Sequence, residues 1–266
     1  MENFIPKRAF TLLEPKPNEE IYEICITLKN KQGALAETAS ALSNAQIDIR
    51  TSTLFEATDK SDLGYWTSFI NISKAKTSIE QIEAELRKLE VVEDVKIAKP
   101  EPLPYDVIHF PMTHGQSAAI VMPSELMSSL FDQVEKILMP SGFIAVFYDA
   151  GKKSGAFIVE LLAKRYGLSG ESLVKALIQA SKALGWGVVE DAKLDVSRPF
   201  CKVKIRYCFE AIMKGLRKDK ACHWTRGFLA GALSRIVGKP MEAIEVKCAA
   251  VGDECCEFEM GIKVIE

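Results

Sequence analysis

Three cysteines and one glutamate late in the chain have a spacing that suits a metal ion. Cys222 stands at the start of an expected helix, whereas Glu245 and Cys248 share an expected strand. Cys256 opens the next strand, across a turn at residues 252–253. An antiparallel hairpin brings residues near its turn opposite each other, and a helix N-terminus favours a thiolate. Three thiolates and one carboxylate suit tetrahedral Zn²⁺ and leave no open position, so the spacing predicts a structural zinc ion.

Two neighbouring residues compete for places in this set. Cys255 competes with Cys256, but adjacent strand residues point to opposite faces, so only one of them can reach the metal. His223 competes with Cys222, but adjacent helical residues diverge by about 100°, which makes it a bystander. The alternative to a metal site is a set of buried free cysteines.

No other group of residues has the pattern of a catalytic site. There are three histidines, and His109 and His114 flank Pro111 in an expected loop. Neither a G-x-S-x-G elbow nor H-E-x-x-H is present, and there is no dinucleotide or phosphate-binding glycine loop. We therefore expect no catalytic residues and a protein that is not an enzyme.

Composition limits the partners. The net charge of −2 lacks the basic excess of a nucleic-acid binder, so we expect no direct nucleic-acid contact. No apolar run reaches the length of a membrane span, and residues 1–18 lack the apolar centre of a signal peptide. These observations predict a cytoplasmic protein with no membrane partner, in which the seven cysteines are reduced.

The first organised block is residues 19–99, behind a mobile N-terminal arm at 1–18. Alternating apolar residues predict strands at its start, middle and end, and a polar hairpin loop is expected at 58–62. Thr77 and Glu80 form an expected capping box ahead of an amphipathic helix. The order is βαββαβ, a ferredoxin-like arrangement within an α+β chain.

Three prolines in residues 100–106 mark a linker, and a second block follows at 107–266. We expect helices near 124–138, 154–166, 171–184 and 222–237. A short buried strand is expected at 143–148, followed by strands near 187–196, 201–213, 243–250 and 255–264. The pattern Gly227-x-x-x-Gly231 predicts close helix contact, either within the domain or at a dimer seam.

Segments 222–238 and 245–256 resemble the C-terminal signature of the 4-vinyl-reductase (4VR) domain. This family includes aromatic-sensing domains of bacterial transcription activators and shares a fold with vesicle-tethering (TRAPP) subunits. Its zinc-bearing members place Cys, Glu, Cys and Cys at the intervals found here. The resemblance implies a mixed α/β domain with a structural zinc and an apolar ligand pocket beside the metal. Candidate pocket residues are the aromatic side chains Trp186, Tyr207, Phe209, Trp224 and Phe228.

The first block resembles the ACT domain through Lys31-Gln-Gly33-Ala-Leu35 and the later Asn44-Ala-Gln-Ile-Asp48. In that family, backbone N–H groups of the glycine turn bind the carboxylate of an amino acid, between two such domains. The resemblance implies a homodimer and an effector loop formed by Gln32, Gly33, Ala34 and Leu35. Lys31 and Gln32 stand where Asp and Pro often precede the glycine, so amino-acid binding and plain dimerisation both stay open.

Together these patterns predict a non-catalytic small-molecule sensor. The ACT-type domain would bind an amino acid or dimerise, and the 4VR domain would bind an apolar compound beside zinc. One alternative is an enzyme or accessory factor acting on a tetrapyrrole-like substrate, which would need an openly coordinated metal. Another is a protein-interaction scaffold, which would have a filled core.

Overall fold

The computed structural model describes residues 12–56, 62–195 and 200–262. The chain forms two compact units, Met1–Ile120 and Val121–Glu266, each with its own core. This boundary lies beyond the predicted linker, because residues 107–120 group with the first unit. Within the described ranges, no helix combines the length and apolar character needed to cross a membrane.

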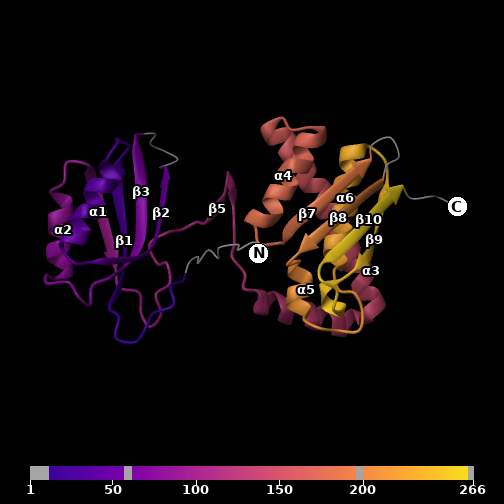
Figure 1. Cartoon of the computed structure of the whole chain (residues 1–266), viewed down its shortest axis with the longest axis horizontal. Helices are drawn as coiled ribbons and strands as arrows, with labels where there is room; N and C mark the ends of the chain where they lie inside the picture. The colour runs from indigo at the N-terminus through magenta and orange to yellow at the C-terminus, as the bar shows by residue number, and fades with distance from the viewer. Residues whose placement is uncertain (1–11, 57–61, 196–199, 263–266) are drawn as a thin grey trace. The chain divides into compact units, whose positions relative to one another are not determined.

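The first unit contains a four-stranded antiparallel sheet in the order β2-β3-β1-β4 (Figure 1). Its elements alternate in the predicted order, strand, helix, strand, strand, helix, strand. A two-residue hairpin, β5-β6, follows the sheet. The bounds are β1 Ile21–Lys29, α1 Ala34–Asn44, β2 Asp48–Glu56, β3 Leu63–Asn71, α2 Ile79–Arg87, β4 Val92–Ala98, β5 Thr113–His114 and β6 Ser117–Ala118.

One face of this sheet packs on α1 and α2. Ile24 and Ile26 of β1 are fully buried there, in one cluster with Leu42 of α1 and Leu86 of α2. On the opposite face, Leu13 is buried with residues of β1 and β3, so this part of the predicted arm packs on the sheet. Residues 1–11 of the arm and most of the predicted 58–62 loop lie outside the described residues.

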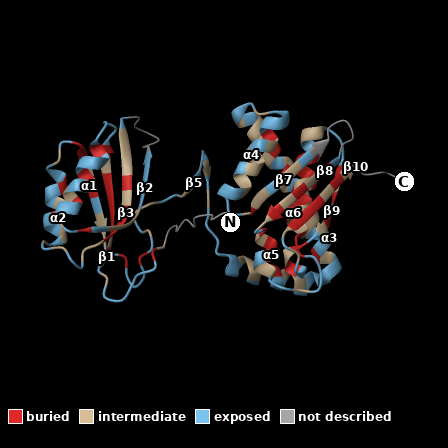
Figure 2. Cartoon of the chain, in the orientation of Figure 1, coloured by how far each residue is buried: buried red, intermediate tan, exposed pale blue. Residues whose placement is uncertain are grey.

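The second unit contains the antiparallel sheet β7-β8-β10-β9 with helices on one face (Figure 1). Buried residues of α6 and the sheet form its largest core cluster, seen as the red stretches of Figure 2. The other face carries ion pairs such as Lys202 with Glu257 and Glu259. The bounds are α3 Ser124–Tyr166, α4 Gly170–Ala183, β7 Val188–Asp195, β8 Phe200–Arg206, α5 Phe209–Lys214, α6 His223–Val237, β9 Met241–Lys247 and β10 Cys256–Ile262, with a 3₁₀ turn at Ala249–Val251.

The predicted strand at 143–148 is wrong, because these residues belong to α3. Helix α3 is interrupted at Met139, which has φ 60° and precedes Pro140, and it continues without a further non-helical residue to Tyr166. Phe143 and Phe147 lie one turn apart, with ring centroids 4.2 Å from each other. A short apolar run fits a buried helix as well as a strand, and here the helix is selected by packing on a neighbour.

That neighbour is α6, and four glycines make the contact. A Cβ built on Gly151 would lie 2.1 Å from the Trp224 carbonyl oxygen, and one on Gly231 would lie 1.9 Å from the Lys152 carbonyl oxygen. Gly155 and Gly227 make equivalent approaches. The predicted Gly227-x-x-x-Gly231 contact is therefore made inside the second unit, against Gly151-x-x-x-Gly155 of α3.

Two further boundaries differ from prediction. The expected strand at 201–213 ends at Arg206, because Tyr207 adopts φ 57° and turns the chain into α5. The capping box of α2 is formed by Ser78 and Gln81, one residue after the predicted Thr77 and Glu80. Only the first difference changes the site, since it moves residues 208–214 from the sheet to the side of α6.

Candidate metal centre and apolar pocket

The four predicted metal ligands converge in the second unit. Cys222 caps α6, Glu245 lies in β9, Cys248 follows β9, and Cys256 opens β10. All four are buried, and one donor atom from each lies within 4.8 Å of the others. The Sγ atom of Cys222 is 3.9 Å from that of Cys248 and 3.6 Å from that of Cys256. The helix start and the two strand ends thus enclose one small volume.

Backbone hydrogen bonds hold the cluster in place. The N–H of Cys222 donates to Glu245 Oε2 at 3.2 Å, and the N–H of Ala249 donates to Cys256 Sγ at 3.4 Å. The Asp253 carboxylate accepts the N–H of Cys248 at 2.8 Å, which closes the turn. The other Glu245 oxygen, Oε1, is buried without a hydrogen-bond partner among the described residues. A cation would satisfy this acceptor, because a buried unpaired carboxylate oxygen is costly.

The electrostatics of the cluster also favour a cation. Burial raises the pKa of Glu245 to about 9. Hydrogen bonding with Cys208 raises the pKa of Cys222 far above its usual range, whereas hydrogen bonding with Cys222 lowers the pKa of Cys248. Without a metal, the group therefore holds its charge on a small part of the donor set. Three thiolates and a carboxylate side by side need a divalent ion, and this donor set matches the N/S/O preference of zinc.

The two competing residues lie apart from this cluster. Cys255 is partly exposed while Cys256 is fully buried, as expected for neighbours on opposite strand faces. His223 packs its ring against Phe143 at a centroid distance of 6.0 Å. Burial lowers the pKa of His223 to about 4, so the ring is neutral at pH 7. Neither residue belongs to the group of converging donors.

A fifth sulfur, Cys208, was missed by sequence reasoning. Its Sγ lies 3.5 Å from Cys222 Sγ and 3.6 Å from the Thr225 hydroxyl, and its side chain is buried. The predicted strand over 201–213 concealed this position, because it carried Cys208 away along the sheet. Its presence among six late cysteines was the one available signal.

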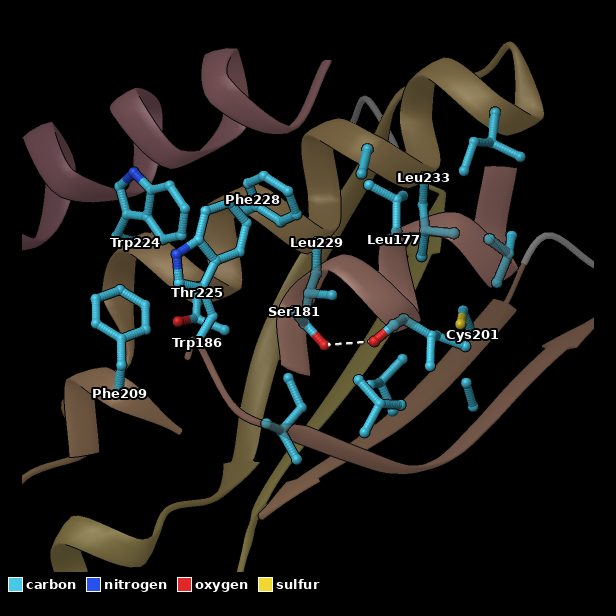
Figure 3. A pocket seen from close by; sticks show the side chains of 18 residues that line it. Leu177, Ser181, Trp186, Cys201, Phe209, Trp224, Thr225, Phe228, Leu229 and Leu233 are labelled. Atoms are coloured by element: carbon cyan, nitrogen blue, oxygen red, sulfur yellow. Dashed lines mark hydrogen bonds between the residues drawn. The ribbon is translucent and has the colours of Figure 1, made fainter. Parts of the chain in front are cut away.

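Beside the metal cluster, an apolar cavity of about 100 Å³ lies between α4, α6 and the strands β7 and β8 (Figure 3). Four predicted residues line it, namely Trp186, Phe209, Trp224 and Phe228. The fifth is a wrong prediction, because Tyr207 is 56% exposed and does not line the cavity. Its backbone turn directs the chain into α5, which places Phe209 in the wall instead.

The aromatic wall is a mutually packed group. The Trp186 ring meets Trp224 edge to face at 5.5 Å and Phe228 at 5.4 Å, while Trp224 stacks on Phe228 at 5.1 Å. Aliphatic residues of α4, the sheet and α6 complete the lining. Polar atoms are few: the Ser181 hydroxyl donates to the Ile178 carbonyl at 2.9 Å, and burial raises the pKa of Cys201 to about 11. Such a cavity suits a small apolar ligand.

The pocket and the metal cluster share the start of α6. Trp224 and Thr225 line the pocket two and three residues after Cys222. Their backbone N–H groups donate to the buried Glu210 carboxyl at 3.0 and 2.7 Å. Burial raises the pKa of Glu210 to about 8, against the lowering effect of these bonds. Glu210, which sequence reasoning also missed, therefore joins α5 to the N-terminus of α6, where an acidic group is favoured.

Replacing Glu210 with alanine will destabilise the second unit. Two buried N–H groups lose their acceptor, at a cost of roughly 2–4 kcal/mol in the free energy of unfolding. Glu210→Gln retains one carbonyl acceptor and will cost less. Urea unfolding followed by tryptophan fluorescence checks this, because two of the three tryptophans line the adjacent pocket. Equal stability of the alanine variant and the wild type would contradict it.

The predicted effector loop of the first unit lies at the start of α1. Gly33 is the N-cap with φ 90°, and no side chain caps the helix. Gly33, Ala34 and Leu35 line a hollow of about 540 Å³ that also contacts Leu54 and Phe55 of β2. Gln32 does not line it. An uncapped helix start is a favourable place for a carboxylate.

Comparison with known proteins matches residues 201–262 to the vinyl-4-reductase (4VR) domain. This region contains the whole metal cluster. An uncharacterized protein of Methanocaldococcus jannaschii, MJ0150, is 25% identical over 122 residues, or 46% of this chain and 66% of that protein. The chain thus spans just under two thirds of that relative.

Solved structures resemble each unit separately. The phenol-responsive sensory domain of the transcription activator PoxR, with phenol, is 17% identical (TM-score 0.49; 56% of this chain, 78% of that chain). A vinyl-4-reductase family protein from Methanocaldococcus jannaschii is 20% identical (TM-score 0.37; 56% and 86%). The ACT domain from GTP pyrophosphokinase of Chlorobium tepidum is 22% identical (TM-score 0.25; 30% and 99%). At these TM-scores the likenesses carry no functional argument.

Proposed function

We propose that this protein is a non-catalytic small-molecule sensor whose second unit binds a small apolar compound beside a structural zinc ion. The observation that carries the proposal is the cavity lined by Trp186, Trp224 and Phe228, which begins two residues after Cys222. Cys222, Glu245, Cys248 and Cys256 would hold the zinc and fix the start of α6. The 4VR match supports the same assignment, since it covers all four residues.

The size of the cavity favours a compound with one ring. An apolar protein cavity of about 150 Å³ binds benzene. The volume of about 100 Å³ here is of that order, and modest side-chain shifts would admit a substituted ring. A tetrapyrrole is several times larger, so the cavity disfavours the accessory-factor alternative. The presence of a cavity also disfavours a pure interaction scaffold.

For the first unit, we infer an ACT-type regulatory module. Its support is the sheet order β2-β3-β1-β4 with both helices on one face, and the uncapped α1 start at Gly33. The module would bind an amino-acid carboxylate at Gly33 or dimerise. A cytoplasmic homodimer without direct nucleic-acid contact stays a prediction from the sequence.

Filling the cavity tests the sensor proposal. Thermal-shift and calorimetric titrations with phenol, toluene and a panel of amino acids identify which class raises the melting temperature of each unit. Ala192→Phe places a ring on the cavity wall and should abolish binding of the single-ring compounds, with a loss of at least about tenfold in affinity.

The matched control is Lys193→Phe, since adjacent strand residues point to opposite faces and Lys193 is exposed. It should bind like the wild type. Full binding by Ala192→Phe, or no response of the folded wild type to any apolar compound, would refute the proposed ligand class.

A further inference from the structure

Glu23, Asp106 and His109 form a second cluster of ligand-type side chains, in the first unit. Glu23 lies in β1, and the other two lie in the segment that follows β4. One donor atom from each falls within 4.8 Å of the others. His109 Nδ1 is 3.0 Å from Asp106 Oδ1 and 3.4 Å from Glu23 Oε1. The three side chains therefore face one common point.

The placement of Glu23 calls for a cation. Ile24 and Ile26 of β1 face the helices, so Glu23 lies on the opposite sheet face, where it is 1% exposed. Its Oε2 accepts the N–H of Val107 at 2.8 Å, and Oε1 is directed at His109. A buried carboxylate is stable only when it is paired, and here a second carboxylate, Asp106, lies beside it. The cluster thus has two acids for one imidazole.

The donor geometry fits a transition-metal ion. Ligand bonds of about 2.0–2.2 Å in a tetrahedral site separate the donor atoms by roughly 3.3–3.6 Å. The Nδ1–oxygen distances of 3.0 and 3.4 Å are close to this separation. The other ring nitrogen, Nε2, is buried without a hydrogen-bond partner among the described residues, so it is also available after rotation of the ring.

The surroundings supply support, a fourth donor and an access route. The N–H groups of Ile108 and His109 donate to Asp106 Oδ1 at 3.2 and 3.0 Å and orient that carboxylate. Cys25 lies two residues after Glu23, on the same sheet face, and its thiol interacts with His109. The side chains of Asp106 and His109 are 26% and 25% exposed, so an ion can enter from solvent.

The charge of the cluster agrees with this geometry. Hydrogen bonds with Cys25 and Glu23 raise the pKa of His109 to about 10. The group thus already attracts one positive charge, as a proton, and a divalent ion can replace it. Imidazole, carboxylate and thiol donors together select zinc, cobalt or nickel over magnesium and calcium.

We propose that Glu23, Asp106 and His109, with Cys25 as an available fourth donor, form a divalent transition-metal site in the first unit. The ion fastens the segment at 106–109 to the open face of the sheet formed by β2, β3, β1 and β4. This site is separate from the cysteine cluster of the second unit and does not depend on the proposed sensor function.

Metal content of the full-length protein tests the proposal. After equilibration with Zn²⁺ and removal of free metal, elemental analysis should find two zinc ions per wild-type chain. His109→Gln and Asp106→Asn should each hold one ion and leave the melting transition of the second unit unchanged. His114→Gln, at an exposed histidine of the same loop region, is the matched control and should hold two.

Far-UV circular dichroism establishes that each variant is folded, and Asp106→Asn serves if His109→Gln is not. A second readout is the zinc-dependent rise in the melting temperature of the first unit, present in the wild type and absent from both variants. One ion per wild-type chain together with an intact cysteine site, or two ions in the folded variants, would overturn the proposal.

Discussion

Replacing Cys248 with serine will unfold the second unit and leave the first unit folded. Cys248 is fully buried, and its sulfur lies 3.9 Å from that of Cys222, at the point where β9, β10 and α6 meet. A structural zinc site in a small domain contributes apparent binding energy on the order of 10 kcal/mol. That is comparable with the whole stability of a typical domain, about 5–15 kcal/mol, so the unit cannot retain its fold without the ion.

The measurement is a thermal unfolding profile combined with elemental analysis. The wild type should show a transition for each unit, and Cys248→Ser should keep the one that belongs to the first. Cys255→Ser is the matched control, because Cys255 is a partly exposed cysteine in the same turn region. It should keep both the metal and the profile. An unchanged profile and metal content in Cys248→Ser would show that these cysteines form an ordinary core.

The metal cluster was predictable because its strand members are close in sequence. Glu245, Cys248 and Cys256 lie within one hairpin, and strand alternation distinguishes Cys256 from Cys255. Placing Cys222 above them required the position of α6, which the cluster spacing and the family resemblance supplied together. Local pattern and resemblance agreed at this site.

Where the path of a loop decides, the sequence could not predict the contacts. Cys208 and Phe209 reach the site because Tyr207 adopts a left-handed φ of 57°, and a tyrosine does not signal such a turn. Glu23 accepts the N–H of Val107 across 84 residues of sequence. This contact depends on how the segment after β4 crosses the sheet, which no periodicity describes. His109 was accordingly interpreted as a loop residue.

The strand predicted at 143–148 failed for a different reason. Its apolar residues fit either secondary structure, and the deciding feature lies further on, at Gly151 and Gly155. A glycine at every fourth position on one helix has meaning only when its partner is known. The matching glycines lie in α6, and α4, β7, β8 and α5 come between the two helices in the chain.

Gly231→Ala will destabilise the second unit by about 3 kcal/mol or more. Its Cβ would lie 1.9 Å from the Lys152 carbonyl oxygen and 2.7 Å from the carbonyl carbon, so backbone meets backbone and no side chain can rotate away. Overpacking usually costs about 1–3 kcal/mol, and rigid backbone places this case at the upper end. Separating α3 from α6 also moves the helix that carries Cys222 and Trp224, so metal retention and ligand binding should weaken together.

Gly142→Ala is the matched control, since Gly142 lies in α3 and its built Cβ meets only Leu138 Cβ, at an ordinary 3.4 Å. Alanine is favoured over glycine in a helix by about 0.5–1 kcal/mol, so this variant should be as stable as the wild type or slightly more stable. Urea unfolding of both variants, monitored by circular dichroism, gives the two free energies. If Gly231→Ala matched Gly142→Ala in stability, α3 and α6 would have to lie further apart, and the start of α6 would not be fixed by α3.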